Sequence, residues 1–438
     1  MLRHWLKHVT LGMAIAALGS ASGLVEASML GQRHWRRDVR ISPAELVPLK
    51  VDRPSRRWLA ADPAAQSTPR PQPDLKQSGQ LSVPQSSLLA NGSLADSYRL
   101  TLTEPREVSI DLLSKELDAY LWLLDETGIA ISQNDDLSEF NYNARIVKRL
   151  PAGRYTILIS TYGVMREGKY TLEVAGTTDV EPISAAEVKF WPESDLSWLD
   201  VNVEMSRLAR AGGSTLDRAY RSVVQVYNGD NSGSGTLLNA SGAILTSFHV
   251  IAEGEQGDRP PRGPIYIGLA LSPDRPVTPL FRCELNRYDV ETDLALLQVS
   301  GDLFGRPLPQ GLSFDFLRLG NPNRVQLGER VTVLGFPGTT AIQAGGSSYL
   351  TLTRGVISAI LSRNGRRRDF LSDVTVNAGN SGGATLNAAG ELIAIPASTV
   401  SETGRTPTDI DRASVLRAVS AIPEDWLAIV ANVSPLLP

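Results

Sequence analysis

The sequence predicts a mostly β protein, in which a small antiparallel β-sandwich precedes a two-barrel β domain with a short helical C-terminus. Two stretches, residues 79–175 and residues 222 to about 400, alternate polar and apolar side chains in short segments separated by turns. The chain has 438 residues, which is enough for two or three domains. We therefore expect two separate β domains joined by a linker.

Composition narrows the class of protein. Hydrophobic residues make up 42% of the chain and charged residues 21%, so most of it can bury a core. The formal net charge is only -4, which gives no electrostatic case for binding nucleic acid or an anionic membrane surface. The single cysteine, Cys283, excludes an intramolecular disulfide, and we interpret it as a small buried hydrophobe rather than a nucleophile.

Residues 1–27 have the three parts of a secretory signal: a basic start, the apolar run Leu11–Leu18, and small residues before a cleavage site at Ser28. Ser20–Ser22 offers an alternative cleavage site. The apolar run is too short to cross a bilayer of about 30 Å as a stable helix. We therefore expect export to the periplasm or the extracellular space, with an uncleaved membrane anchor as the alternative.

Two linkers separate the expected domains. Residues 28–78 are rich in Arg, Pro, Ser, Gln and Ala and keep no period for long, which is typical of disorder. Residues 176–203 contain prolines among mixed polar residues and form the second linker. The second domain, residues 204–438, is expected to begin with a helical segment over 205–220 and to end with another over 411–430.

The first domain, residues 79–175, contains several short strands at the spacing of a β-sandwich. The segments Leu94–Tyr98, Asp118–Leu121 and Leu150–Tyr155 resemble the bacterial pre-peptidase C-terminal (PPC) domain family. The resemblance implies an accessory domain of the kind that secreted peptidases carry, here placed before the second domain rather than after it.

Acidic residues of the first domain, Asp118, Asp125, Asp135 and Asp136, fall near the ends of predicted strands. Carboxylates gathered there could bind Ca²⁺, but no EF-hand spacing is present. Turns favour aspartate in any case. We prefer the turn interpretation and keep calcium binding as the alternative.

The positions of the four histidines sort the chemistry. His4 and His8 lie in the predicted signal and His34 in the first linker, which leaves His249 in the folded region. A metal site built from several histidines is therefore excluded there. His249 follows a strand, a tight turn and a second strand, a placement that would hold an imidazole rigidly at the edge of a cleft.

Two motifs supply partners for such a histidine. Asp293 precedes the apolar segment Leu294–Val299, where a carboxylate can accept from imidazole Nδ1–H and fix its tautomer; a surface strand cap is the alternative. Ser381 is flanked by Gly379, Asn380, Gly382 and Gly383, which suits a tight turn with an exposed Oγ; an ordinary glycine-rich turn is the alternative. In that turn the amides of Gly379 and Ser381 could form an oxyanion hole, with Asn380 holding the loop.

The order His, Asp, Ser and the segments around these residues resemble the trypsin-like (chymotrypsin-fold) peptidases, and in particular the bacterial HtrA/Deg-type branch. The segments that carry the resemblance are Thr246–Val250, Thr292–Leu297, Gly379–Gly383, Val333–Gly338 and Thr353–Ser358. It covers residues 222 to about 400 and implies a two-barrel trypsin-like domain. It also implies catalytic His249, Asp293 and Ser381, with an oxyanion hole at Gly379, Asn380 and Ser381.

Departures from this branch limit what can be carried over. Phe248 stands where the branch has a small residue, so it either reshapes the cleft or packs beneath it, and Ala384 replaces a proline. We expect no PDZ module, because no further domain of about 90 residues follows position 400. The neutral Asn380 cannot pair with a freed N-terminal amine, which argues against activation by such an amine.

The resemblance also locates a specificity pocket, which we assign to Thr375, Ile395 and Ala397. Thr375 stands six residues before Ser381, where a carboxylate would select Lys or Arg. Threonine lacks that charge, so we expect an apolar or small P1 side chain.

The function expected is a serine endopeptidase that cleaves protein or peptide substrates, with no metal and no cofactor. An inactive binding or adhesion protein on the same fold is the main alternative. An esterase is a third, although the chain has no Gly-x-Ser-x-Gly nucleophile elbow in a strand–turn–helix context.

Overall fold

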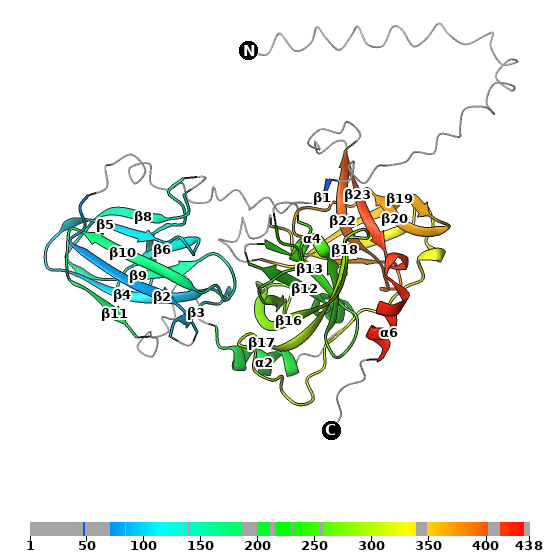
Figure 1. Cartoon of the computed structure of the whole chain (residues 1–438), viewed down its shortest axis with the longest axis horizontal. Coiled ribbons are helices and arrows are strands. Elements are labelled where there is room, and N and C mark those ends of the chain that lie inside the picture. Colours follow the sequence, from blue (N-terminus) through cyan, green and yellow to red (C-terminus); the bar gives the residue numbers. More distant parts are fainter. Residues whose placement is uncertain are drawn as a thin grey trace, which may run out of the picture. The chain divides into compact units, whose positions relative to one another are not determined.

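The computed structural model describes residues 47–48, 71–83, 85–138, 141–184, 199–210, 215–229, 231–254, 257–338, 348–401 and 412–432 (Figure 1). The predicted signal and most of the first linker lie outside these ranges. Within them the chain is mostly β, with a sandwich followed by two barrels, which confirms the predicted fold class. None of the helices in the described ranges is long and apolar enough to span a membrane.

The first domain is a sandwich of two antiparallel sheets. Its strands are β2 (Leu75–Leu81), β3 (Ser87–Leu88), β4 (Leu94–Leu102), β5 (Arg106–Leu113), β6 (Ala119–Leu124), β7 (Ala130–Asn134), β8 (Ala144–Leu150), β9 (Gly153–Thr161), β10 (Gly168–Ala175) and β11 (Val180–Ile183). One sheet has the order β2-β10-β5-β8, and the other has the order β11-β4-β9-β6-β7 with β3 on β4. The strands extend beyond the expected range 79–175 at both ends.

Apolar side chains from both sheets form the sandwich core, which includes the fully buried Leu100 and Leu172. A polar contact also bridges the sheets. The Tyr98 hydroxyl of β4 lies 2.8 Å from that of Tyr170 of β10, and Tyr170 donates to Asp96 at 2.6 Å. Burial raises the pKa of Tyr170. The phenol therefore stays protonated and keeps its donor.

The expectation that residues 176–203 form a linker is wrong in part. Residues Val180–Ile183 form β11, which pairs antiparallel with β4, and Val180 is buried. Pro182 is compatible with this strand because β11 lies at the edge of its sheet, where a missing N–H leaves no partner unsatisfied. A short edge strand interrupted by proline gives little sequence signal.

The carboxylate of Asp125 caps the turn between β6 and β7. Its Oδ1 accepts from the hydroxyl of Thr127 at 2.7 Å, from the Thr127 amide at 2.9 Å, and from the Ile129 amide at 3.1 Å. The bond from the Thr127 hydroxyl leads the causes that lower the pKa of Asp125. These bonds agree with the turn interpretation of this residue.

The second domain opens with two helices, α2 (Val201–Arg210) and α3 (Thr215–Arg221), on either side of residues 211–214, which lie outside the described ranges. A closed barrel of six antiparallel strands follows. Its members are β12 (Val223–Asn228), β13 (Asn231–Leu237), β14 (Ala243–Ser247), β15 (Ile265–Leu269), β16 (Thr278–Asp289) and β17 (Leu294–Asp302), with the short helix α4 (Phe248–Ile251) after β14. The order around the barrel is β12-β13-β14-β17-β16-β15. Cys283 of β16 is 2% exposed, which agrees with its interpretation as a small buried hydrophobe.

The second barrel is also a closed ring of six strands. They are β18 (Arg330–Gly335), β19 (Thr351–Arg363), β20 (Arg366–Ser372), β21 (Ala384–Leu386), β22 (Leu392–Ser401) and β23 (Arg412–Ala418). The order is β22-β21-β18-β19-β20-β23, and the pairing of β22 with β23 closes the ring, while β1 (Val47–Pro48) adds to β22. The 3-10 turn η2 (Pro322–Arg324) precedes this barrel, and η3 (Val419–Ala421) and α6 (Glu424–Asn432) follow it.

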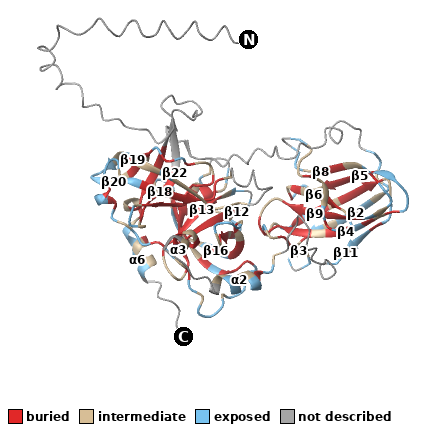
Figure 2. Cartoon of the chain, turned by 180° about the vertical axis from the view of Figure 1, so that it is seen from behind, coloured by how far each residue is buried: buried red, intermediate tan, exposed pale blue. Residues whose placement is uncertain are grey.

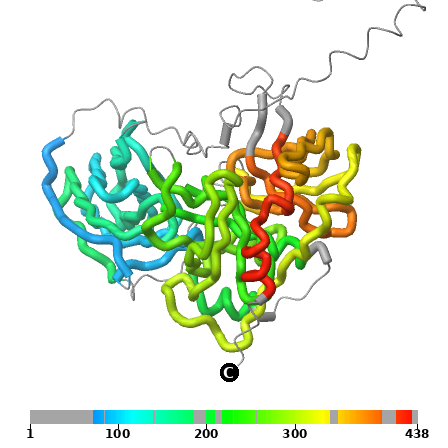
Figure 3. The backbone as a smooth tube through the Cα atoms, turned by 45° about the vertical axis from the view of Figure 1, so that its right-hand side comes forward, coloured from blue at the N-terminus to red at the C-terminus, as the bar shows by residue number. Residues whose placement is uncertain are grey.

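The prediction of a helix over 411–430 is wrong for its first half. Residues Arg412–Ala418 form β23, which pairs with β20 on one side and β22 on the other. The apolar residues Val415, Leu416 and Val419 also fit the spacing of a helix, and the polar Ser414 and Arg417 are buried with them, so the stretch lacks the alternation that marks a strand. The second half is helical, and Trp426 of α6 packs in a core cluster with residues of both barrels. In Figure 3 this C-terminal helix is the red coil of the backbone tube.

Buried residues are concentrated in the strands of the sandwich and of the barrels (Figure 2). The buried set includes one ion pair in the second barrel, between Asp369 of β20 and Arg417 of β23, whose Nε and Oδ1 lie 2.7 Å apart. Burial raises the pKa of Asp369, while Arg417 and Arg368 act in the opposite direction. The charged form of the Asp369 carboxylate is therefore stabilised by these two arginines.

Replacing Arg417 by Met should therefore lower the free energy of unfolding by about 3 kcal/mol, because it leaves a buried carboxylate without its partner. The control is Arg363→Met, which removes an exposed ion pair to Glu291 and should cost about 0–1 kcal/mol. Urea unfolding followed by circular dichroism measures both. Equal costs for the two variants would show that the buried pair contributes no more than a surface pair.

Candidate active site

His249 lies in the first turn of α4, directly after β14. We expected it at the end of a strand, and the structure places it two residues beyond that end. The residue before it, Phe248, is buried and stacks on Tyr288 with ring centroids 4.9 Å apart. Of the two roles expected for Phe248, packing is therefore the one observed.

Asp293 holds the imidazole from the turn before β17. Its Oδ2 lies 2.7 Å from His249 Nδ1, and its Oδ1 accepts from the His249 amide at 2.9 Å. The carbonyl of Asp293 also accepts from the Phe248 amide at 3.1 Å. Asp293 has φ +54°, a left-handed conformation that aspartate tolerates better than most residues. The carboxylate thus orients the ring and selects the tautomer with a proton on Nδ1.

Ser381 occupies a tight turn between β20 and β21. The Asn380 amide donates to the Asn377 carbonyl at 3.0 Å, and the Gly383 amide donates to the Asn380 carbonyl at 3.0 Å. Gly379 has φ +96°, and a Cβ on it would lie 2.4 Å from the Phe336 carbonyl oxygen. Only glycine fits at this position without displacing the backbone.

Ser234 of β13 fastens this turn to the first barrel. Its amide donates to the Ser381 carbonyl at 2.9 Å, and its hydroxyl donates to the Gly379 carbonyl at 2.7 Å. The same hydroxyl accepts from the Phe336 amide at 2.9 Å. A second link runs within the second barrel, where the Gly382 amide donates to the Pro396 carbonyl of β22 at 3.0 Å. Sequence reasoning missed Ser234, although its place between Gly233 and Gly235 marks a close backbone approach.

Several polar groups at and near the turn have no partner among the residues that the structure describes. Ser381 Oγ and His249 Nε2 are both buried, and neither makes a hydrogen bond with the described residues. The amides of Gly379 and Ser381 donate no hydrogen bond in the described part of the chain either. Buried unpaired groups are costly and call for a reason, and a bound substrate would supply their partners.

Asn380 contributes differently from the other two residues of the expected oxyanion hole. Its amide is committed to Asn377, so it cannot donate to a ligand. Its side-chain Oδ1 would lie 2.7 Å from a Cβ on Gly335, so the side chain packs against β18. Asn380 therefore holds the loop, and the free amides are those of Gly379 and Ser381.

The three residues of the expected specificity pocket do not share one environment. Thr375 is exposed, and its carbonyl accepts from the Thr353 hydroxyl at 2.9 Å. Ile395 is buried in a core cluster with residues of both barrels, so its side chain is not free to line a pocket. Ala397 is buried in β22, next to the carbonyl of Pro396 that accepts a hydrogen bond from the Ser381 turn.

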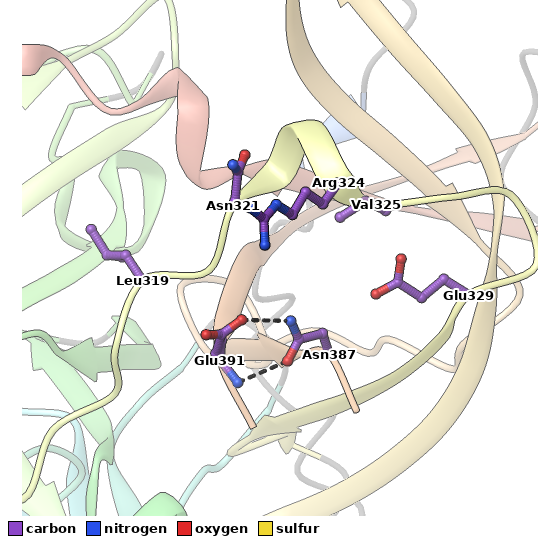
Figure 4. A pocket seen from close by; sticks show the side chains of 7 residues that line it. All are labelled: Leu319, Asn321, Arg324, Val325, Glu329, Asn387 and Glu391. Atoms are coloured by element: carbon purple, nitrogen blue, oxygen red, sulfur yellow. Dashed lines mark hydrogen bonds between the residues drawn. The ribbon is translucent and has the colours of Figure 1, made fainter. Parts of the chain in front are cut away.

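A separate cavity of about 330 Å³ contains none of these residues (Figure 4). Its lining consists of Leu319, Asn321, Arg324, Val325, Glu329, Asn387 and Glu391. Asn387 Nδ2 donates to the Glu391 carboxylate at 2.9 Å, and the Glu391 amide donates to Asn387 Oδ1 at 2.9 Å. These bonds close the turn between β21 and β22. The cavity therefore lies over a structural turn and holds no nucleophile paired with a base.

Comparison with known proteins shows what the second domain is similar to. The family model described as "Trypsin-like peptidase domain" matches residues 233–395, a range that includes Ser234, His249, Asp293 and Ser381. "Serine endoprotease DegS" of Escherichia coli is 32% identical over 214 residues, which cover 44% of this chain and 51% of the relative. "Probable periplasmic serine endoprotease DegP-like" of Pseudomonas fluorescens is 29% identical over 211 residues, which cover 45% of this chain and 37% of the relative.

A further relative is "Serine endoprotease DegS" of Haemophilus influenzae, which is 31% identical over 180 residues and covers 40% of this chain and 43% of the relative. The chain thus spans about half, or less, of the length of these curated relatives. All three matches support a region similar to HtrA-type serine proteases. They do not determine the activity or the substrate of this chain.

The close approach of Gly379 to the backbone around Phe336 can be tested by substitution. Gly379→Ala should lower the free energy of unfolding by about 3 kcal/mol, because the added Cβ meets backbone atoms and the residue keeps a strained φ. The control is Gly365→Ala, which has φ +76° but no atom within 4 Å of the new Cβ, and should cost about 1 kcal/mol. Urea unfolding compares the two, and equal costs would contradict the close approach of Gly379 to the backbone around Phe336.

Proposed function

We propose that the chain is a serine endopeptidase with Ser381 as nucleophile, His249 as general base and Asp293 as the group that orients the base. The proposal is carried by the two hydrogen bonds between Asp293 and His249. Oδ2 of Asp293 lies 2.7 Å from the ring Nδ1, and Oδ1 accepts from the His249 amide at 2.9 Å. These bonds leave Nε2 as the one ring nitrogen able to take a proton. The free Oγ of Ser381, fixed on a turn tied to the same barrel, is the matching nucleophile.

The reaction follows from these roles. His249 Nε2 accepts the proton of Ser381 Oγ as the oxygen attacks a peptide carbonyl, and Asp293 stabilises the resulting imidazolium. The free amides of Gly379 and Ser381 donate to the developing oxyanion. His249 then gives its proton to the leaving amine, and water attacks the ester so that Ser381 is regenerated.

Ser381 Oγ and His249 Nε2 make no hydrogen bond with each other or with any other residue that the structure describes. Catalytic hydrogen bonds are often long without substrate and shorten when it binds. The missing contact between Ser381 and His249 would also fit a weakly active or inactive binding protein on the same fold, which is the competing candidate. Hydrolysis that depends on Ser381 distinguishes the two.

Substrate preference and location complete the proposal. Neither Thr375 nor Ala397 carries a negative charge, so cleavage after apolar or small residues is expected rather than after Lys or Arg. The basic–apolar–small pattern of residues 1–27 favours export. The Pseudomonas relative is named as a periplasmic protein, which supports the periplasm as the destination.

The test compares wild type with Ser381→Ala on an unfolded protein such as casein. We expect Ser381→Ala to lower the rate by about 10⁴-fold or more, because it removes the nucleophile. The control, Ser300→Ala, removes an exposed serine of β17 and should leave the rate unchanged. Digestion by Ser381→Ala at the wild-type rate would overturn the assignment.

Sequencing the fragments from the wild-type digest measures the P1 preference. We expect cuts after Val, Ala, Leu or similar residues. Cuts that fall mainly after Lys or Arg would show that a negative charge from elsewhere lines the pocket, and would contradict the reading of Thr375.

A further inference from the structure

A two-residue strand from the region before the sandwich pairs with the second barrel. β1, Val47–Pro48, is antiparallel to β22, with Val47 opposite Thr399 and Pro48 opposite Ser398. The other side of β22 is paired with β23. On the side of β1, β22 is paired with β21 only as far as Ala394. The later residues of β22 are not paired with β21, and β1 pairs with them instead (Figure 1).

This edge of β22 begins beside the nucleophile. The Pro396 carbonyl, two residues before Ser398, accepts from the Gly382 amide, and Gly382 directly follows Ser381. Because β1 is antiparallel to β22, the chain enters at Thr399 and runs toward Pro396. β1 therefore runs along β22 toward Pro396, whose carbonyl holds the Ser381 turn.

Backbone pairing with a free strand edge needs no particular side chains, so any extended peptide can use it. An extended substrate that lies across Ser381 can use the same edge, because Pro396 at its start is bonded to the Ser381 turn. Val47 suits a strand, and Pro48 is tolerated because β1 is itself an edge strand. The edge can hold β1 or a substrate, but not both.

We propose that β1 is an intramolecular peptide ligand of the active-site edge of β22 and competes there with substrate. The competition with substrate rests on the proposed peptidase function, whereas the pairing of β1 with β22 does not. A tether of this kind supplies an effective concentration of about 1 mM, so a weak contact suffices to occupy the edge for much of the time.

The first arm of the test measures the pairing without activity. In the Ser381→Ala background of the full chain, Val47→Pro removes a backbone N–H from β1, and Val47→Gly with Pro48→Gly weakens its strand preference. Val39→Pro, in the same predicted linker, is the matched control. We expect amide hydrogen exchange in the β22 segment that contains Ser398 and Thr399 to be about tenfold faster in both β1 variants than in the control. Unchanged exchange in both would overturn the proposal.

The second arm measures competition in chains that retain Ser381. The β1 variants should raise kcat/KM for a short apolar peptide about two- to tenfold through a lower KM, with kcat unchanged. Modification of Ser381 by a small fluorophosphonate, which does not need the β22 edge, should proceed at one rate in all variants. Equal KM values with normal modification would reject the competition, whereas absence of modification and hydrolysis would reject the peptidase function and leave the first arm intact.

Discussion

The contact between Ser234 and the Ser381 turn is the interaction on which the candidate site depends. His249 and Asp293 belong to the first barrel and Ser381 to the second, so their relative position is set where the barrels meet. Ser234 contributes three hydrogen bonds there, to Ser381, Gly379 and Phe336. Since its hydroxyl is fully buried, these bonds are not exchanged for bonds to water. The Ser381 turn is thereby fixed to β13, which pairs with β14, the strand that leads to His249.

Glycines make this contact possible. A Cβ on Gly382 would lie 2.2 Å from the Ser234 carbonyl oxygen, and one on Gly379 would meet the Phe336 carbonyl. Both residues also have positive φ, so any other residue would be strained as well as crowded. The glycine-rich sequence around Ser381 is therefore explained by two backbones in close approach. The free amides of Gly379 and Ser381 are a consequence of the same tight turn.

The sequence predicted the fold class and the motifs well, because strand alternation and glycine-flanked serines leave local signals. The pairing of His249 with Asp293 is confirmed as a contact, whereas their catalytic roles stay a prediction. The elements that were missed, β11 and β23, are strands whose identity depends on a partner elsewhere in the chain. Ile395 was expected in a pocket and lies in the core, because its side of the strand is decided by a barrel register that the sequence does not display.

The most direct test of this account is the effect of Ser234→Ala on the rate of peptide hydrolysis. The variant leaves the Phe336 amide and the Gly379 carbonyl without their shared partner, so the turn should shift and kcat/KM should fall about 10- to 100-fold. Ser232→Ala, on the same strand two residues earlier, serves as the control and should retain the wild-type rate. A Ser234→Ala variant as active as Ser232→Ala would contradict the proposal that Ser234 positions Ser381.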